Sequence, residues 1–127
     1  MPLTTSLCLA GASGLFNLWL AYRCVRIRLD GPGGVGDLEN PALRSRMRAH
    51  SNFVEYTPFV LILVALIEHS GGRAPLLQEL GIAYMTGRVL HALGIERPVF
   101  TMQFIGAMTT WLVLLVLVVW ALVIALA

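Results

Sequence analysis

Four polar side chains lie where one long apolar segment of the sequence begins. They occur in the run RAHSNFVEY, which continues into TPFVLILVALI with no turn signal between. The four are an arginine, an amide, a carboxylate and a phenol: Arg48, Asn52, Glu55 and Tyr56. Their spacing of i, i+4, i+7 and i+8 places them on one helical face. Ionisable groups at membrane depth cost about 2.5 to 3.5 kcal/mol each on insertion scales, so they indicate a functional site.

A second polar stripe follows in the next apolar segment. Tyr84, Arg88 and His91 are spaced at i, i+4 and i+7. Consecutive spans are antiparallel, and this stripe lies near the end of its segment whereas the first lies near the start of its own. We therefore expect both stripes at one depth, where Arg23 and Arg26 from the first helix complete a basic pocket. Several arginines with one carboxylate suit a small anionic ligand that also bears an amine.

Simpler interpretations of these residues remain open. An ion pair between Glu55 and Arg88 would lock the bundle, although desolvation offsets most of the attraction in such a pair. His91 could equally be a neutral packing residue. The three histidines (His50, His69 and His91) occupy different faces or levels, so we expect no metal site.

The elements that must position these stripes are membrane spans. The chain has 127 residues, of which 57% are hydrophobic, and four apolar segments at about 3–22, 53–67, 76–95 and 104–127. About 20 apolar residues are needed to cross the hydrocarbon core. We predict an all-α integral membrane protein, a four-transmembrane-helix bundle with up-down topology, in which residues 1–127 form a single domain.

Local signals define the ends and contacts of these helices. Asn40 and Pro41 predict the start of the second helix, and Pro58 predicts a kink within it. Gly71 and Gly72 predict its end. Asn17, inside the first helix, predicts a hydrogen bond to another helix. The charged residues around the glycine turn predict solvated pairing at the membrane interface: Glu68, His69, Arg73 and Glu79.

The distribution of positive charge predicts the orientation of the chain. All nine basic residues are arginines, and six of them lie between positions 23 and 48. By the positive-inside rule, the first and third connections face the cytoplasm and both termini lie on the non-cytoplasmic side. The net charge is +2, and membrane topology already explains why the arginines cluster. We therefore expect no nucleic acid partner.

Both stripes resemble the MAPEG family, the membrane-associated proteins in eicosanoid and glutathione metabolism. The run RAHSNFVEYTP at 48–58, with its arginine, asparagine, glutamate, tyrosine and proline, is similar to the family signature at the start of the second helix. The run YMTGRVLHALG at 84–94 resembles the family in the third helix. The similarity extends over all four spans and is greatest to small bacterial members, which implies the bacterial inner membrane.

This resemblance implies a homotrimer that binds glutathione between neighbouring subunits at the cytoplasmic side. Glu55 would contact the glutathione ammonium and the arginines its carboxylates. His91 occupies a position where several members have tyrosine. The residues implied in glutathione binding are Arg23, Arg26, Arg48, Asn52, Glu55, Tyr56, Tyr84, Arg88 and His91.

The resemblance also implies a reaction, the activation of glutathione as a thiolate. The thiolate is the nucleophile, and a nearby arginine favours it over the thiol. Catalytic members have this arginine near the start of the fourth helix, where this chain has Gln103 and Phe104. Arg97 is the nearest arginine and hence the catalytic candidate. The expected activity is that of a glutathione-dependent transferase or peroxidase acting on lipophilic small molecules from the bilayer.

Two other functions fit parts of the sequence. A non-catalytic MAPEG-like protein would keep the fold and bind glutathione or lipid without turnover, as the absent fourth-helix arginine suggests. A small multidrug exporter would match the length and the number of spans. Such exporters depend on a membrane-embedded carboxylate in the first helix, which has none here.

Overall fold

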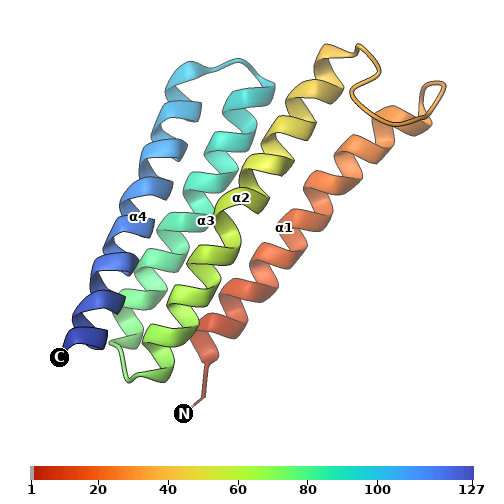
Figure 1. Ribbon diagram of the computed structural model, residues 1–127. Helices are drawn as coiled ribbons and strands as arrows, with labels where there is room; N and C mark the ends of the chain where they lie inside the picture. Colours follow the sequence, from red (N-terminus) through yellow and green to blue (C-terminus); the bar gives the residue numbers. More distant parts are fainter. Residues whose placement is uncertain (1) are drawn as a thin grey trace.

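The computed structural model describes residues 2–127, which form four helices and no strand (Figure 1). These are α1 (Thr4–Leu29), α2 (Pro41–His69), α3 (Ala74–Glu96) and α4 (Phe100–Leu126). Successive helices run in opposite directions, so the α1–α2 and α3–α4 connections lie at one end of the molecule (Figure 1). Residue 2, the α2–α3 turn and the C-terminus lie at the other end. The predicted all-α bundle with up-down topology is confirmed.

The helices are longer than the apolar segments. At about 1.5 Å per residue, the 29 residues of α2 extend about 43 Å, beyond the roughly 30 Å of the hydrocarbon core. Length and composition alone qualify α2 and α4 as membrane spans. The arginine-rich start of α2 therefore extends past the apolar part of the bundle.

The start of α2 follows the predicted local signals. The side chain of Asn40 accepts a hydrogen bond from the backbone N–H of Leu43 at 3.1 Å, and Pro41 is the first helical residue. The helix continues through Pro58, and the kink there stays a prediction. It ends before Gly71, whose φ of +83° lies in the left-handed region that glycine adopts without strain.

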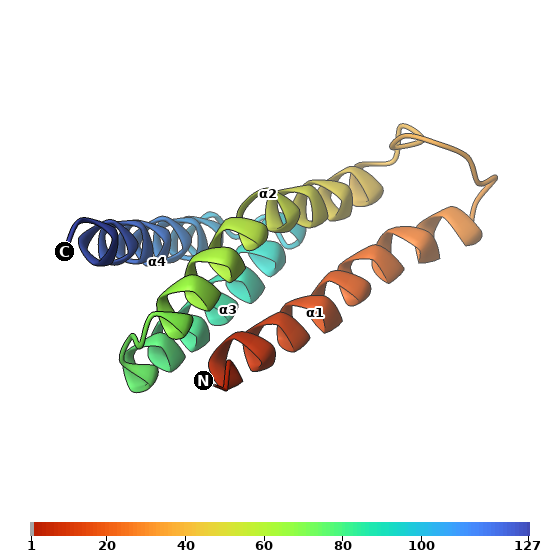
Figure 2. The ribbon, with the colours of Figure 1, turned by 60° about the horizontal axis from the view of Figure 1, so that its bottom comes forward.

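The helices are arranged with α2 and α3 between α1 and α4 (Figure 2). Helix α4 packs on α3 and α2, whereas α1 packs on α2 and α3 and makes no contact with α4. The predicted interhelical bond of Asn17 is present, because its Oδ1 lies 2.8 Å from His50 Nε2 on α2. The apolar core between the helices includes Val60, Val64 and Leu117.

Two glycines allow the backbones of α3 and α4 to approach closely. A Cβ atom at Gly106 would lie 2.6 Å from the backbone nitrogen of His91, and one at Gly87 would lie 3.0 Å from Thr109 Cβ. Side chains at these positions would push the helices apart. This approach brings polar groups of α4 within reach of the second polar stripe on α3.

The carboxylate of Glu68 connects the end of α2 to the start of α1. Its Oε1 accepts from the backbone N–H of Thr5 at 2.8 Å, and its Oε2 accepts from the N–H and the hydroxyl of Ser6 at 2.8 and 2.6 Å. The side chain is buried. The prediction of solvated pairing was therefore wrong for Glu68, which satisfies two free donors at the N-terminus of another helix.

The α1–α2 connection is held by polar contacts despite its four glycines. Arg28 donates to the carbonyl of Gly34 at 2.7 Å, and Arg44 donates to Asp37 Oδ2 at 2.7 Å. The hydrogen bond from the Arg44 guanidinium lowers the pKa of the Asp37 carboxyl. Asp37 therefore stays ionised, and the contact persists, at neutral pH.

Candidate functional site

The two predicted stripes meet around the guanidinium of Arg88. This arginine lies on α3 and is only 1% exposed. Its guanidinium donates to Asn52 Oδ1 on α2 and to Thr110 Oγ1 on α4, the latter at 3.1 Å, and lies 3.4 Å from His91 Nδ1. Three helices thus supply neutral hydrogen-bond partners to one buried cation. We call Asn52, Tyr56, Arg88, His91 and Thr110 the Arg88 cluster.

The positive charge of Arg88 has no carboxylate partner within the described part of the chain. No ion pair involves it, and its Nε atom is buried without a hydrogen-bond partner. The ring of Tyr56 lies 5.8 Å from the guanidinium carbon, a distance at which a cation–π attraction is effective. A buried charge without a counterion is destabilising, so this cluster favours an anion nearby.

The charged pair at the edge of the cluster is Arg48 with Glu55. Their side chains lie 3.7 Å apart and are 63% and 52% exposed. Glu55 therefore pairs with Arg48 and not with Arg88, the alternative that the sequence left open. An exposed pair of this kind contributes little to stability, roughly 0 to 1 kcal/mol, so both charges are accessible to a ligand.

The two tyrosines of the stripes have different surroundings. Tyr56 is half-buried, and its hydroxyl accepts from Trp111 Nε1 at 3.1 Å. Tyr84 is completely buried, and its hydroxyl lies 2.7 Å from Thr57 Oγ1. Because the Thr57 hydroxyl donates to the carbonyl of Phe53, Tyr84 is the donor to Thr57. Tyr84 thus connects α3 to α2 within the core, one turn from Arg88.

Three of the predicted site residues lie elsewhere at the same end of the bundle. Arg23 forms an ion pair with Glu96 and covers the ring of Trp19, with 4.4 Å between the guanidinium carbon and the ring centroid. Arg26 is exposed beside the ring of Tyr22. Arg97 is exposed at the end of α3, nine residues or about 13 Å of helix beyond Arg88. Within one chain, the structure does not bring these arginines to the Arg88 cluster.

Sequence analysis missed two members of the site on α4. Thr110 accepts from Arg88, and Trp111 donates to Tyr56. The signal was present as the run MTTW, the polar interruption in an otherwise apolar helix. Among the described residues, no group of three or more histidine, cysteine, aspartate or glutamate side chains is placed to hold a metal ion.

The fold and the site together define a class: a polytopic membrane protein in which the second, third and fourth helices surround a buried arginine. Comparison with known proteins gives the family. The MAPEG family model matches residues 6–123, and the chain belongs to that family.

The chain is also similar to the inner membrane protein YecN of Escherichia coli strain K12. The two are 30% identical over 106 residues, which cover 84% of this chain and 81% of the relative. The match to YecN of the Escherichia coli strain CFT073 has the same extent. The family agrees with the all-α bundle, and family and relative together show that the protein is a membrane protein.

Proposed function

We propose that this protein binds glutathione against the stripe on α2 and presents it, as the thiolate, to lipophilic electrophiles in a transferase or peroxidase reaction. The observation that carries the proposal is the buried guanidinium of Arg88, which has neutral hydrogen-bond partners and no counterion among residues 2–127. An adjacent anion would offset the destabilisation of this charge. Membership of the MAPEG family supports glutathione as the ligand.

The functional groups of the stripe are complementary to those of glutathione. Glutathione has two carboxylates, one ammonium and one thiol. Glu55 is available to the ammonium and Arg48 to a carboxylate, since both are exposed and only weakly paired. Asn52 and Tyr56 lie between them and Arg88, so amide and phenol groups are available to the peptide backbone of the ligand.

The two charged residues of the stripe lie on the outside of the single chain, which supports a site completed by a second subunit. More than half of each charged side chain is exposed, 63% of Arg48 and 52% of Glu55. In the homotrimer that we propose, a neighbouring copy would cover this face and enclose glutathione. Of the two first-helix arginines of that copy, Arg26 is exposed and would be available to the ligand, whereas Arg23 is paired with Glu96.

Two arginines are candidates to stabilise the thiolate. Arg88 is buried, where a guanidinium stabilises a neighbouring anion more strongly than in water. Arg97 is exposed and lies about 13 Å further along α3. We favour Arg88 for this role and retain Arg97 as the alternative.

The test is calorimetric titration of the detergent-purified protein with glutathione, followed by ultraviolet absorbance of the thiolate in the same sample. Saturable binding with thiolate formation is the expected result. Absence of binding would refute the assignment of the ligand. S-methylglutathione, which cannot ionise at sulfur, is the control that separates thiolate absorbance from a general effect of binding.

A non-catalytic glutathione- or lipid-binding protein is the second candidate. It is favoured by α4, which contains no arginine from Phe100 to Leu126. In this case glutathione would bind without thiolate formation, because no further cation reaches its sulfur. The same titration therefore distinguishes the two functions.

A further inference from the structure

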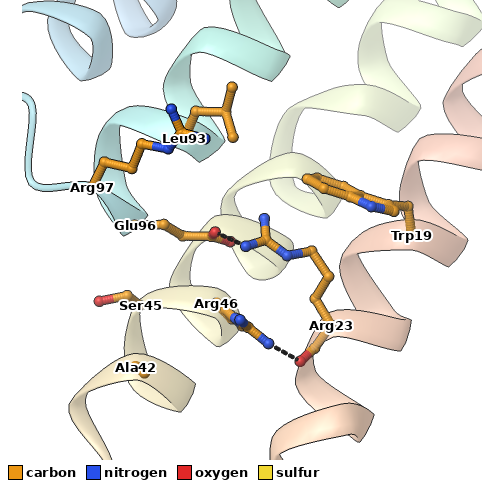
Figure 3. Close-up of a pocket in the computed structure, with 8 residues that line it drawn as sticks. All are labelled: Trp19, Arg23, Ala42, Ser45, Arg46, Leu93, Glu96 and Arg97. Atoms are coloured by element: carbon orange, nitrogen blue, oxygen red, sulfur yellow. Dashed lines mark hydrogen bonds and ion pairs between the residues drawn. The ribbon is translucent and has the colours of Figure 1, made fainter.

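A second polar site lies at the end of the bundle that carries the α1–α2 and α3–α4 connections. A cavity of about 380 Å³ lies there between α1, α2 and α3 (Figure 3). None of its lining residues belongs to the Arg88 cluster, so the cavity is a separate site. Its charged lining residues are three arginines and one glutamate: Arg23, Arg46, Arg97 and Glu96.

These charges give the cavity an excess of positive charge. The lining contains three guanidinium groups and one carboxylate, which leaves two uncompensated positive charges. Arg46 uses one nitrogen to donate to the backbone carbonyl of Arg23 at 2.7 Å. The guanidinium of Arg97 forms no ion pair within residues 2–127. Arg46 and Arg97 thus have donors available to an anion, for which the planar guanidinium is well suited.

The ion pair that crosses the cavity leaves one buried donor and one buried acceptor unused. Arg23 reaches from α1 to Glu96 on α3 and pairs through Nη2 and Oε2 (Figure 3). Arg23 Nη1 and Glu96 Oε1 are both buried and have no hydrogen-bond partner in the part of the chain that the structure describes. The Glu96 side chain is only 9% exposed. Because unpaired buried polar groups are destabilising, both atoms favour a ligand that can donate and accept. A single hydroxyl group does both.

We propose that this cavity binds a phosphate ester that bears a free hydroxyl, such as a glycerophosphate group. The phosphate would lie between Arg46 and Arg97, and the hydroxyl would accept from Arg23 and donate to Glu96. Basic pockets between transmembrane helices on the cytoplasmic side typically bind anionic lipid headgroups. A phosphatidylglycerol headgroup and soluble glycerol 3-phosphate share this chemistry. The site does not depend on glutathione binding.

The test uses full-length protein purified in a neutral detergent and titrated with phosphatidylglycerol or phosphatidylcholine, with bound lipid counted by native mass spectrometry. We expect saturable binding of phosphatidylglycerol and much weaker binding of phosphatidylcholine. Arg97→Gln should weaken phosphatidylglycerol binding about fivefold, as expected for one arginine at an anionic lipid surface. Arg44→Gln is the control, since Arg44 is exposed at the same end but pairs with Asp37 outside the cavity.

A second variant tests the site by filling the cavity with a larger side chain instead of removing a charge. Ala42 lines the cavity and is itself exposed, so Ala42→Phe should occupy part of the space with little effect on folding. It should reduce phosphatidylglycerol binding, and glutathione binding should not change. Loss of both phosphatidylglycerol and glutathione binding in Ala42→Phe would mean that this variant disturbs the fold. The test then depends on Arg97→Gln: weaker phosphatidylglycerol binding with an unchanged melting transition would support the site, and unchanged binding would overturn it.

The remaining outcomes distinguish a lipid ligand from a soluble ester, or reject the site. Saturable binding of glycerol 3-phosphate to lipid-free protein, with the same loss in Arg97→Gln, would support the site and assign it to a soluble ester. Equal weakening by Arg97→Gln and Arg44→Gln would indicate general surface charge and overturn the proposal. Equal binding of both lipids would overturn it too, as would no binding of either probe.

Discussion

At the scale of single residues, the feature that organises the site is a buried cation with uncharged partners. Arg88 would be destabilising alone, and the contacts from Asn52 and Thr110 offset only part of that cost. A guanidinium held in this state is already oriented toward neutral acceptors before any ligand arrives. Such pre-organised charge stabilises a developing anion without further rearrangement.

The contribution of α4 to this arrangement is tested by Thr110→Val. The change keeps the shape of the side chain but removes the acceptor for Arg88, which leaves a buried charged donor unsatisfied at a cost of about 1 to 3 kcal/mol. We expect a lower melting temperature in detergent and weaker glutathione binding. Thr109→Val is the matched control, because the Thr109 hydroxyl bonds only to the carbonyl of Ile105 on its own helix. Equal effects of the two changes would contradict a role for the Arg88 contact.

The exposed part of the stripe is tested by Arg48→Ala. Arg48 is 63% exposed and pairs only with Glu55, so its removal should leave the melting temperature nearly unchanged. Loss of a charge-assisted contact of about 1.4 kcal/mol should weaken glutathione binding roughly tenfold by calorimetry. Arg44→Ala removes an arginine from the same helix outside the stripe and should not change the affinity. Unchanged affinity in Arg48→Ala would exclude this residue from the site.

The two candidates for thiolate stabilisation are separated by Arg97→Ala. If Arg88 stabilises the thiolate, this variant should retain turnover and thiolate absorbance, because Arg97 is exposed and distant from the cluster. If Arg97 activates the thiol, turnover should fall more than glutathione affinity. The decisive measurement is the thiolate absorbance at saturating glutathione, since it reports the ionisation of sulfur independently of the electrophile.

At the scale of helices, features that depend on a short stretch of sequence were predicted well. Contacts between helices were harder to predict from the sequence. The cap at Asn40 and Pro41 depends on backbone geometry over four residues, and it is present as predicted. The stripes on α2 and α3 meet because antiparallel neighbours place them at one depth. Thr110 was missed because apolar residues surround the polar run MTTW in α4, so the sequence did not indicate which face of the helix packs on α3.

Glu68 shows the same limit for the first two helices. Its contacts are with Thr5 and Ser6, more than 60 residues earlier, and depend on the relative height of α1 and α2. No local pattern contains that information. The positions of Arg23 and Arg97 depend on tertiary packing in the same way. Both line the cavity between α1, α2 and α3 and so lie away from the Arg88 cluster.

The cap that joins these helices is tested by Glu68→Gln. The amide keeps one acceptor but turns an NH2 group toward the donors of α1, and it removes a negative charge from a helix N-terminus. We expect a loss of about 1 to 2 kcal/mol in stability, with faster hydrogen exchange confined to the first turns of α1. Glu79→Gln, at an exposed position on α3, is the control. Unchanged exchange in α1 would show that the cap is dispensable.

At the scale of the whole molecule, the two ends of the bundle differ in charge as well as in connectivity. Eight of the nine arginines lie on or beside the half that carries the α1–α2 and α3–α4 connections, and only Arg73 lies at the opposite turn. Both the Arg88 cluster and the basic cavity are in this half. If the two proposals hold, the orientation of the chain determines which compartment supplies glutathione and which leaflet supplies the anionic ester.

That orientation is tested with single cysteines in a chain that carries Cys8→Ser and Cys24→Ala. Ser70→Cys lies in the α2–α3 turn, and Val35→Cys lies in the α1–α2 connection, where residue 35 is 98% exposed. The positive-inside rule predicts that an impermeant maleimide added to intact cells labels only Ser70→Cys, and that Val35→Cys reacts after permeabilisation. The reverse pattern would place both arginine sites on the non-cytoplasmic side. Cytosolic glutathione would then be out of reach, so the proposed reaction depends on this result.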